Sequence, residues 1–512
     1  MAAFHCRLRH RGLFLKTIAL APGRVPPENG FTINWFDITY RFWPHLVVGF
    51  HSLAALLASA HALLNKRDSR AATLWLGIIW FLPILGPILY LALGVNRIRR
   101  KAISLGVHKS LPRPVPQNLG ESELSKVEHL QMLARVVGRV VAQPLAPGNR
   151  LRPLVNGDEA FPAMLAAIDS AAKSISLVTY IFDNDESGRQ FAESLGRAVK
   201  RGVAVRVLID AAGTRYSWPS IMHRLRHLKV PFARFLPASL LTPWRVTTVN
   251  LRNHRKVMVV DGQIAFTGGM NIRHGNVLKQ NPRSPVRDLH FCVEGLVVGQ
   301  LQEAFAADWA FTTGETLDGD LWFPELPERG EVVARVIADG PDADFETVRW
   351  TLLAALAEAQ HTVRILTPYF LPDTAMVTAL NLAALRGVTV DIILPARSNL
   401  RFVDWASRAM WWQVLERGCR MWLTRGPFDH SKLVIVDGHW VLLGSANWDA
   451  RSLRLNFELN TEAYGREFAE RMGKIIEEKL QGARGVSLED ADARSCAAKL
   501  RDAIARLFSP YL

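Results

Sequence analysis

Cysteine is scarce in this sequence, and no two cysteines stand close together. The 512 residues include four, Cys6, Cys292, Cys419 and Cys496, and none belongs to a Cys-x-x-Cys motif. Their spacing matches neither a disulfide framework nor a cysteine-ligated zinc site. We therefore expect free thiols, which are typical of proteins that fold in a reducing compartment.

Charged side chains are missing from two stretches near the N-terminus. Residues 42–65 and 71–96 contain no Asp, Glu, Lys or Arg, and each run exceeds the roughly 20 residues that a helix needs to cross a bilayer. Residues 66–70 leave room only for a tight turn, so we predict a two-span transmembrane hairpin over residues 42–101. The alternative is a buried helical hairpin in a soluble domain.

Acidic residues are absent from the start of the chain, where five basic residues precede Glu28. A transit peptide can have this composition, but a basic cytoplasmic tail over residues 1–41 is the simpler interpretation. Basic residues also follow the second apolar run, at positions 97–101. The positive-inside rule then places both ends of the hairpin in the cytoplasm.

The length and net charge of the chain limit which domain organisations and which binding partners are possible. A chain of 512 residues is too long for one ordinary core, which favours two lobes plus additional segments. The formal net charge is +15 at pH 7. Such an excess favours anionic partners, namely nucleic acid, anionic lipid or a phosphate substrate, without choosing among them.

One motif occurs twice. Each copy consists of His-x-Lys, four residues, Asp, six residues, and then Gly-Gly or Gly-Ser followed by x-Asn. One copy could arise from ordinary composition, but two with the same spacing indicate a duplicated unit with one half-site in each copy. The matching residues are His254, Lys256, Asp261 and Asn271 in the first copy, and His430, Lys432, Asp437 and Asn447 in the second.

The residue types in the motif suit chemistry on a phosphodiester. The apolar runs 257–260 and 433–436 predict buried strands, and side chains two residues apart share one face of a strand. Each copy would therefore present an imidazole beside an ammonium, with an asparagine amide as a further donor to phosphate. Incidental polar ends of two buried strands and a metal site are the alternatives. Two lysines facing one centre would repel a cation, so we expect no metal and no other cofactor.

This doubled motif resembles the two HKD motifs of the phospholipase D superfamily. The resemblance implies that one histidine, His254, attacks phosphorus to form a phosphohistidine, while His430 protonates the leaving alcohol and then deprotonates the incoming one. It also implies that Asp288 and Glu458 orient the two imidazoles. The implied catalytic set consists of the His, Lys and Asp of both motif copies. Within this set, we expect Asp261 and Asp437 to have a structural role and to brace the turn that follows each motif strand. The implied phosphate ligands are Lys256, Asn271, Lys432 and Asn447.

The remainder of the sequence repeats as well. The helix and strand patterns over residues 161–209 recur in the second half of the chain, as a helix that ends at residue 360 and the elements over residues 362–394. In this repeat Gly202 matches Gly387, and Tyr180 matches Tyr369. Alternating helices and strands predict an α/β fold. We expect two phospholipase D-like sandwich lobes related by a pseudo-two-fold axis. The predicted boundaries are a linker over 102–150, a first lobe over 151–330 and a second lobe over 331–512.

Further segments, including residues 210–218 and 507–512, resemble the bacterial cardiolipin synthase subgroup. That resemblance implies a phosphatidyltransferase of the cell inner membrane, with its catalytic part in the cytoplasm, that makes cardiolipin from two phosphatidylglycerol molecules. A phospholipase D with water as acceptor and a nucleic-acid phosphodiesterase remain alternatives, as does a non-enzymatic membrane adaptor. A transmembrane hairpin argues against nucleic acid as a partner. The oligomeric state is not predicted.

Three further segments have open interpretations. Residues 121–141 have helical apolar spacing and could form a membrane-surface helix or a brace on the first lobe. Residues 235–244 and 402–412 are rich in large apolar side chains. If exposed, they would anchor the protein at a lipid interface near the pocket mouth; if buried, they would be ordinary core.

Overall fold

The computed structural model describes residues 35–66, 69–94, 127–141, 143–237, 251–340 and 345–509. The chain divides into two compact units, Met1–Val95 and Asn96–Leu512, and each is described by itself. Most of the predicted basic tail and the first part of the predicted linker lie outside the described residues. Residues 238–250, which include much of one predicted interfacial segment, also lie outside them.

The N-terminal unit is helical. It consists of α1 (Trp35–Asn65), α2 (Ser69–Phe81), α3 (Leu85–Leu89) and the π-helix η1 (Tyr90–Gly94). Small side chains of α1, such as Ala55 and Ala62, pack in a buried cluster with Trp75 and Ile79 of α2. The outward faces of both helices remain apolar and exposed.

Within the described residues, one helical stretch, Phe42–Asn65, is long and apolar enough to cross a membrane. The prediction of two spans is therefore not supported. The second apolar run breaks after Phe81, where Pro83 and the left-handed backbone of Ile84 (φ 63°) separate α2 from α3. A 13-residue helix such as α2 rises only about 20 Å, which is less than the ~30 Å hydrocarbon core of a bilayer.

The second unit is built on one mixed sheet, which contains fifteen strands in the part of the chain that the structure describes. Its first half contains β1 (Ala146–Val155), α7 (Asn156–Ser170), β2 (Ser174–Thr179), α8 (Glu186–Lys200), β3 (Ala204–Asp210), α9 (Ile221–His227), β4 (Phe232–Phe235), β5 (Val257–Val260), β6 (Ile264–Gly268), β7 (Val286–Arg287), β8 (Leu289–Glu294) and α10 (Val297–Thr313).

The second half repeats this succession and extends it. It contains β9 (Val332–Asp339), α11 (Thr347–Glu358), β10 (Thr362–Leu366), α12 (Thr374–Leu385), β11 (Thr389–Pro395), α13 (Arg401–Arg408), α14 (Trp412–Leu415), β12 (Arg420–Thr424), β13 (Phe428–Asp429), β14 (Leu433–Val436), β15 (Trp440–Gly444), α15 (Ala450–Arg454), β16 (Glu458–Tyr464), α16 (Arg466–Leu480), β17 (Arg484–Val486), α17 (Leu488–Asp492) and α18 (Cys496–Arg506).

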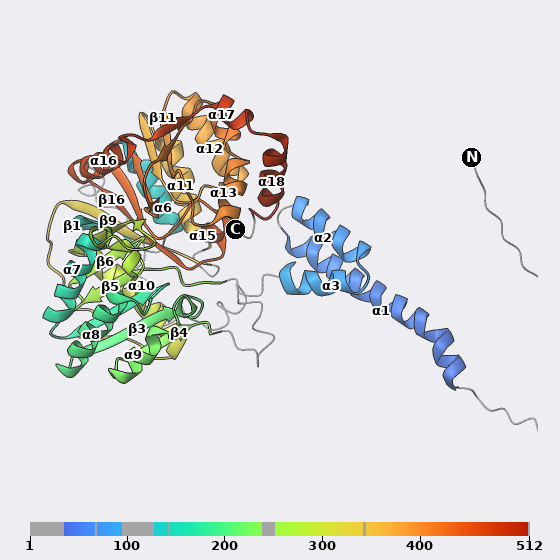
Figure 1. Cartoon of the computed structure of the whole chain (residues 1–512), viewed down its shortest axis with the longest axis horizontal. Coiled ribbons are helices and arrows are strands. Elements are labelled where there is room, and N and C mark those ends of the chain that lie inside the picture. Colours follow the sequence, from blue (N-terminus) through green and yellow to red (C-terminus); the bar gives the residue numbers. More distant parts are fainter. Residues whose placement is uncertain are drawn as a thin grey trace, which may run out of the picture. The chain divides into compact units, whose positions relative to one another are not determined.

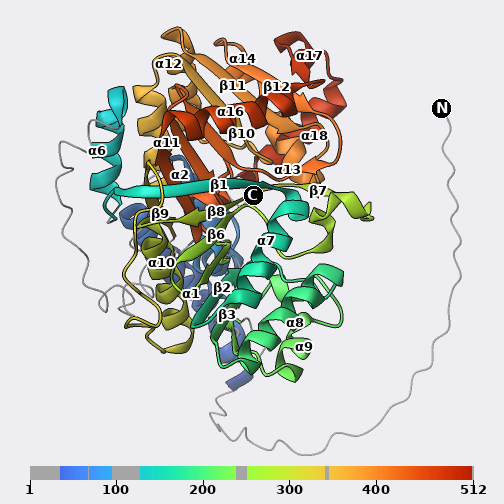
Figure 2. The ribbon, with the colours of Figure 1, turned by 90° about the vertical axis from the view of Figure 1, so that its left-hand side faces the viewer.

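The strand order reads the same outward from its centre in both directions. One half runs β1-β8-β6-β5-β2-β3-β4, and the other runs β9-β16-β15-β14-β10-β11-β12, with β17 added at its edge. The halves join where β1 pairs antiparallel with β9, and Figure 2 shows β1 crossing the middle of the unit. This arrangement agrees with two phospholipase D-like lobes related by a pseudo-two-fold axis.

The two lobes share one hydrophobic cluster, and each lobe has a further cluster of its own. Helices α10 and α16 lie on the same side of the continuous sheet, because Phe305 and Trp309 of the first and Met472 and Ile476 of the second belong to one buried cluster. Figure 1 shows α16 in the upper and α10 in the lower part of the unit. Sharing this cluster makes each lobe dependent on the other for burial of its apolar surface. The site between the lobes is thus held by a rigid junction.

Helix α6 (Gln131–Val140) braces the second lobe, and the prediction of a brace on the first lobe or a membrane-surface helix is wrong. Its buried residues Leu133, Ala134 and Val137 pack in the same core cluster as Leu352 of α11. Arg335 of β9 donates a 3.1 Å hydrogen bond to the Ala134 carbonyl. Figure 2 shows α6 beside α11.

Candidate active site

Each motif copy begins in an extended segment and continues into a central strand. The strands β5 and β14 are fully buried and cover the residues that the apolar runs predict. Each strand then reverses through an Asp-Gly turn with left-handed backbone: φ is 53° at Asp261 and 67° at Gly262, and 51° at Asp437 and 62° at Gly438. Two such residues in succession are typical of tight turns between adjacent antiparallel strands, and three residues separate the paired strand ends here.

The motif aspartates connect these turns to neighbouring strands. The carboxylate of Asp261 accepts hydrogen bonds of 2.7–2.9 Å from the N–H groups of residues 172–174 at the start of β2. Asp437 accepts three 2.8 Å bonds from residues 360–362 before and at the start of β10, and His129 adds a contact of 2.8 Å. Neither aspartate lines the cavity described below, so neither can contact a substrate there.

Each motif histidine contacts a carboxylate of the other lobe. Nδ1 of His254 lies 3.0 Å from Glu458 Oε2, and Nδ1 of His430 lies 2.8 Å from Asp288 Oδ2. Sequence analysis predicted these two carboxylates but not which histidine each one contacts. The pairing is crossed, so each imidazole depends on a carboxylate that follows the other motif copy.

The backbone repeats the crossed pairing. The N–H of His254 donates to the Phe457 carbonyl at 2.8 Å, and the N–H of His430 donates to the Arg287 carbonyl at 2.7 Å. Each acceptor immediately precedes the orienting carboxylate. Because Nδ1 and the backbone of each histidine are both fixed, Nε2 is the ring nitrogen left to meet a substrate.

Both histidines line one cavity of about 820 Å³. Asn271 and Asn447, the predicted phosphate ligands, also line it. The side-chain oxygen of Asn271 accepts from the Ile181 N–H at 3.1 Å, which leaves its amide hydrogens for a ligand. The two half-sites therefore meet around a single space, as the duplicated motif predicts.

The motif lysines lie behind the histidines rather than on the cavity wall. Lys256 and Lys432 are buried, and each ammonium donates to the carbonyl of the histidine two residues earlier. Burial lowers the pKa of Lys256 to about 7 and that of Lys432 to about 8, while nearby carboxylates oppose the shift. The lysines can thus carry charge near neutral pH, most readily when an anion is present.

Burial also lowers the pKa of both histidines. The pKa of His430 falls to about 4 because burial and the Lys432 charge outweigh the attraction of Asp288. The pKa of His254 is lowered by burial against the attraction of Glu458. Both imidazoles are therefore neutral near pH 7.

The two His–carboxylate pairs are not equivalent. Ser445 donates its hydroxyl to Glu458 Oε2 at 2.5 Å, and Asn456 donates to Oε1 at 3.0 Å. In the first copy Gly269 occupies the position of Ser445, and a Cβ there would lie 2.4 Å from Asp288 Oδ1. The glycine therefore leaves room for Asp288, which lacks the equivalent hydroxyl donor.

Buried ion pairs anchor the segments that carry the histidines, and sequence analysis missed them. In the first lobe, Arg255 and Asn253 bind Asp308 of α10 at 2.8 and 2.7 Å. In the second lobe, Asp429 binds Lys479 of α16 at 2.5 Å. The charges are reversed between the copies, so the repeat of the motif does not reveal these partners.

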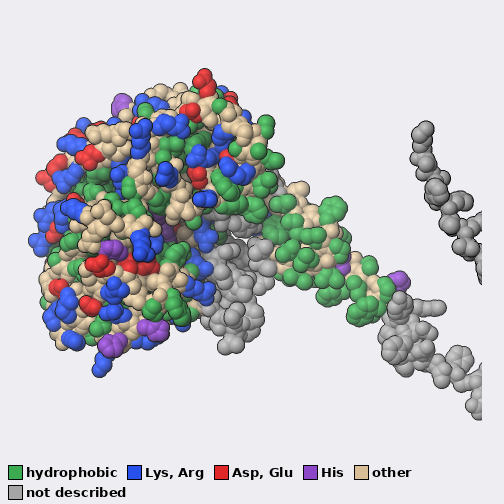
Figure 3. Space-filling view, in the orientation of Figure 1, with side chains coloured by type: hydrophobic (Ala, Val, Ile, Leu, Met, Phe, Trp, Pro, Cys, Tyr) green, Lys and Arg blue, Asp and Glu red, His purple; other side chains and the backbone are tan. Residues whose placement is uncertain are grey.

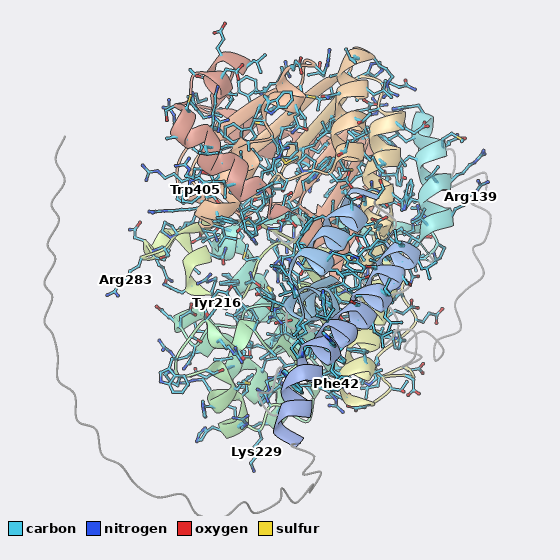
Figure 4. The ribbon with its side chains drawn as sticks, turned by 90° about the vertical axis from the view of Figure 1, so that its right-hand side faces the viewer. Phe42, Arg139, Tyr216, Lys229, Arg283 and Trp405 are labelled. Atoms are coloured by element: carbon cyan, nitrogen blue, oxygen red, sulfur yellow. The ribbon has the colours of Figure 1, made fainter. Side chains whose placement is uncertain are left out.

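The cavity rim combines basic and aromatic side chains. Four arginines line it, and so does Phe402 of α13, which is 39% exposed. Trp411 is buried and Trp412 is 43% exposed, so the segment 402–412 is partly core and partly surface. Figure 4 labels Tyr216 and Trp405 on one side of this unit, in the first and the second lobe respectively. The four arginines are Arg252, Arg273, Arg401 and Arg451.

Three of the four cysteines lie in the described part of the chain. Cys292, Cys419 and Cys496 are unpaired, as the spacing predicts, and Cys6 lies outside the described residues. No group of three or more His, Cys, Asp or Glu side chains is arranged to hold a metal ion within those residues.

Comparison with known proteins yields a family match over both lobes. The family described as "Cardiolipin synthase, PLD-like domain" matches residues 164–309 and 352–480, and "Phospholipase_D-nuclease N-terminal" matches residues 53–94. A cardiolipin synthase of Geobacillus sp. (strain WCH70) is 32% identical over 486 residues, which cover 93% of this chain and 96% of that protein. Cardiolipin synthase A of Pseudomonas fluorescens is 32% identical over 484 residues, which cover 92% and 99%.

A solved structure shows the same fold. The crystal structure of phosphatidylserine synthase from Haemophilus influenzae Rd KW20 superposes with a TM-score of 0.57 and 15% identity. The match covers 74% of this chain and 100% of that one.

Proposed function

The chain belongs to the family of PLD-like cardiolipin synthases, and from this premise we propose that it is a membrane-bound phosphatidyltransferase. It would join two phosphatidylglycerol molecules into cardiolipin and release glycerol. The observation that carries the proposal is the pair of crossed His–carboxylate contacts at one cavity.

In the first step, Nε2 of His254 attacks the phosphorus of one phosphatidylglycerol, and the P–O bond to the headgroup glycerol breaks. His430 transfers its Nε2 proton to the departing glycerol oxygen. The products are free glycerol and a phosphatidyl group bound to His254. Glu458 and Asp288 hold Nδ1 of the two rings, so that Nε2 is aimed at the phosphorus and at the leaving oxygen respectively.

In the second step, the headgroup hydroxyl of another phosphatidylglycerol gives its proton to His430 and attacks the same phosphorus. The P–N bond to His254 breaks, and cardiolipin leaves. His430 again holds a proton and His254 is free, so the enzyme returns to its starting state.

The charge of the substrate provides the protonation state that this mechanism needs. His430 must begin as an acid, although burial lowers its pKa to about 4. A phosphodiester anion in the cavity favours the protonated imidazole and the protonated lysines. Asn271 and Asn447 would donate to the phosphate oxygens, with Lys256 and Lys432 supplying positive charge from behind.

The arginines that line the cavity favour an anionic lipid over a zwitterionic one, because they attract the phosphate of both but repel the cationic group of a zwitterionic headgroup. The apolar helix Phe42–Asn65 would hold the chain at the membrane. We assign the protein to the cell inner membrane, with the catalytic unit on the cytoplasmic side, because Lys66, Arg67 and Arg70 directly follow this helix.

The test is stoichiometric turnover by the full-length protein in vesicles that contain phosphatidylglycerol. Cardiolipin and glycerol should form in equal amounts, and His254→Ala and His430→Ala should each reduce the rate at least ~100-fold. His227→Ala, on the exposed face of α9, serves as the control. Phosphatidic acid as the main product would indicate a hydrolase, and near-normal activity of either histidine variant would contradict the two-histidine site.

A further inference from the structure

Helix α18 has its apolar side facing outward. Asp502 and Ala505 are buried against the rest of the unit, whereas Leu500, Ile504 and Leu507 are 63%, 49% and 75% exposed. A helix on a water-facing surface normally buries its apolar side and exposes its polar side. The reversed arrangement indicates that the outer side of α18 meets an apolar environment.

Specific contacts hold α18 in this orientation. The carboxylate of Asp502 accepts from Arg494 at 2.6 Å and from Arg501 at 2.7 Å. The Arg501 guanidinium also lies 4.5 Å from the ring centre of Trp405 on α13. Arg501 and Asp502 lie on the same helix, so rotating it to bury Leu500 would break the contacts of Asp502 with Arg494 and of Arg501 with Trp405. The outward apolar side is therefore a stable feature.

The apolar surface continues from α18 to the cavity. The ring of Phe508 lies 5.6 Å from that of Phe402, and Phe402 and Leu400 line the cavity that contains both histidines. Figure 3 shows hydrophobic side chains gathered on the side of the catalytic unit where α18 and α13 lie. We call this surface the docking face; it consists of Leu400, Phe402, Leu500, Ile504, Leu507 and Phe508.

The charges beside the docking face are mainly basic. Arg401 at the start of α13 and Lys499, Arg501 and Arg506 on α18 accompany it, although Lys499 is near Asp492 at 3.9 Å. An apolar helix side flanked by Lys and Arg is typical of helices that lie in the interfacial region of an anionic bilayer.

We propose that the docking face inserts into the interfacial layer of an anionic lipid bilayer, beside the mouth of the cavity. A lipid could then move from the bilayer into the cavity along Phe402 and Leu400 without exposing its acyl chains to water. The identity of the substrate rests on the proposed function, whereas the contact with the bilayer can be measured without any turnover.

The first experiment measures the contact directly. The native thiol of Cys496, which is exposed at the start of α18, is labelled with a fluorophore in a full-length Cys6→Ser chain held in nanodiscs with one copy per disc. Nitroxide-labelled phosphatidylglycerol should quench the fluorophore. The double variant Ile504→Ser/Leu507→Ser should lose this quenching, and Leu382→Ser/Leu385→Ser, two exposed leucines of α12, should retain it.

The second experiment separates docking from chemistry. On vesicles of long-chain phosphatidylglycerol, Ile504→Ser/Leu507→Ser should reduce kcat/KM about tenfold, the order expected from losing partial burial of two apolar side chains. On a monomeric short-chain phosphatidylglycerol, the same variant should match the wild type, because the catalytic residues are unchanged. An equal loss on both substrates would mean damage to the fold and would overturn the proposal.

The remaining outcomes also discriminate. Quenching that is absent, or that is unchanged by Ile504→Ser/Leu507→Ser, would overturn the bilayer contact. Protection of the Cys496 label that depends on protein concentration in detergent would assign the face to a second copy instead. Turnover that is absent on every phosphatidylglycerol while quenching persists would refute the proposed function and leave the docking face intact.

Discussion

The replacement of Asp288 by Asn tests the crossed pairing most directly. Asp288 is buried, its Oδ2 lies 2.8 Å from Nδ1 of His430, and its Oδ1 accepts from the Leu289 N–H at 2.9 Å. Asn has nearly the same shape, so the packing should survive. The variant removes the negative charge that stabilises a protonated His430 and lets the amide present a donor that favours the wrong tautomer.

The expected loss can be estimated from the type of contact. A buried hydrogen bond to a charged group contributes about 1.5–3 kcal/mol, and loss of the correct tautomer adds to that. A comparable change in a His–Asp pair costs up to about 10⁴-fold in kcat. We therefore expect Asp288→Asn to reduce kcat between about 10²-fold and 10⁴-fold, or roughly 3–5 kcal/mol of barrier.

The assay compares two leaving groups. If His430 is the acid, Asp288→Asn should severely slow release of glycerol from phosphatidylglycerol. It should slow release of p-nitrophenol from a phosphatidyl p-nitrophenol much less, because that leaving group needs no proton. Glu458→Gln, which affects the attacking His254, should slow the first step with both substrates.

Two results would refute this reasoning. Equal losses of Asp288→Asn on the glycerol and p-nitrophenol substrates would remove His430 from the role of acid. In nitrogen NMR spectra of the imidazoles, a change in the His254 signal rather than the His430 signal of Asp288→Asn would refute the crossed pairing itself.

Four further predictions concern the same site. Asp261→Asn should keep kcat near that of the wild type but lower the free energy of unfolding by about 1–2 kcal/mol, because the carboxylate braces a turn outside the cavity. Denaturant titration measures the stability and a turnover assay measures kcat; a loss of kcat at unchanged stability would contradict this prediction. Gly269→Ala should reduce turnover at least about tenfold without unfolding the protein, since its Cβ would displace Asp288; unchanged activity would show that Asp288 tolerates the shift. The affinity for dimethyl phosphate, whose charge is constant, should fall roughly tenfold as pH rises through about 7 and 8, because Lys256 and Lys432 lose protons there. A pH-independent affinity, measured by calorimetry, would show that the charges of the two lysines do not contribute to phosphate binding. EDTA should leave turnover unchanged, because the lysines supply the positive charge; inhibition reversed by one divalent ion would show that a metal is needed.

Local elements followed closely from the sequence because their causes are local. The strands at residues 257–260 and 433–436 are apolar, β-branched runs that end in Asp-Gly, and this pair of residues suits a left-handed turn. Gly202 and Gly387, which align in the repeat, both have positive φ, 88° and 91°. The spacing of the motif and its doubling identified the histidines and the family.

Other features depended on tertiary packing, that is, on which helices and strands pack against each other. The apolar spacing of residues 121–141 shows that one side of α6 is covered but not that α11 of the second lobe covers it. The second apolar run is long enough to span a membrane, yet Pro83 and Ile84 interrupt it between α2 and α3. The reversed polarity of α18 became visible only when Asp502 was seen to face inward.

The sequence by itself determined the histidines and asparagines that line the cavity, since backbone periodicity and turn chemistry act over a few residues and place His beside Lys in each copy. Only the tertiary structure decided how they combine. His254 meets Glu458 across 204 residues and His430 meets Asp288 across 142, and both contacts exist because β1 and β9 join the two halves of one sheet. The physical reason is that contacts between lobes depend on packing of distant surfaces over a shared core, which no local spacing encodes.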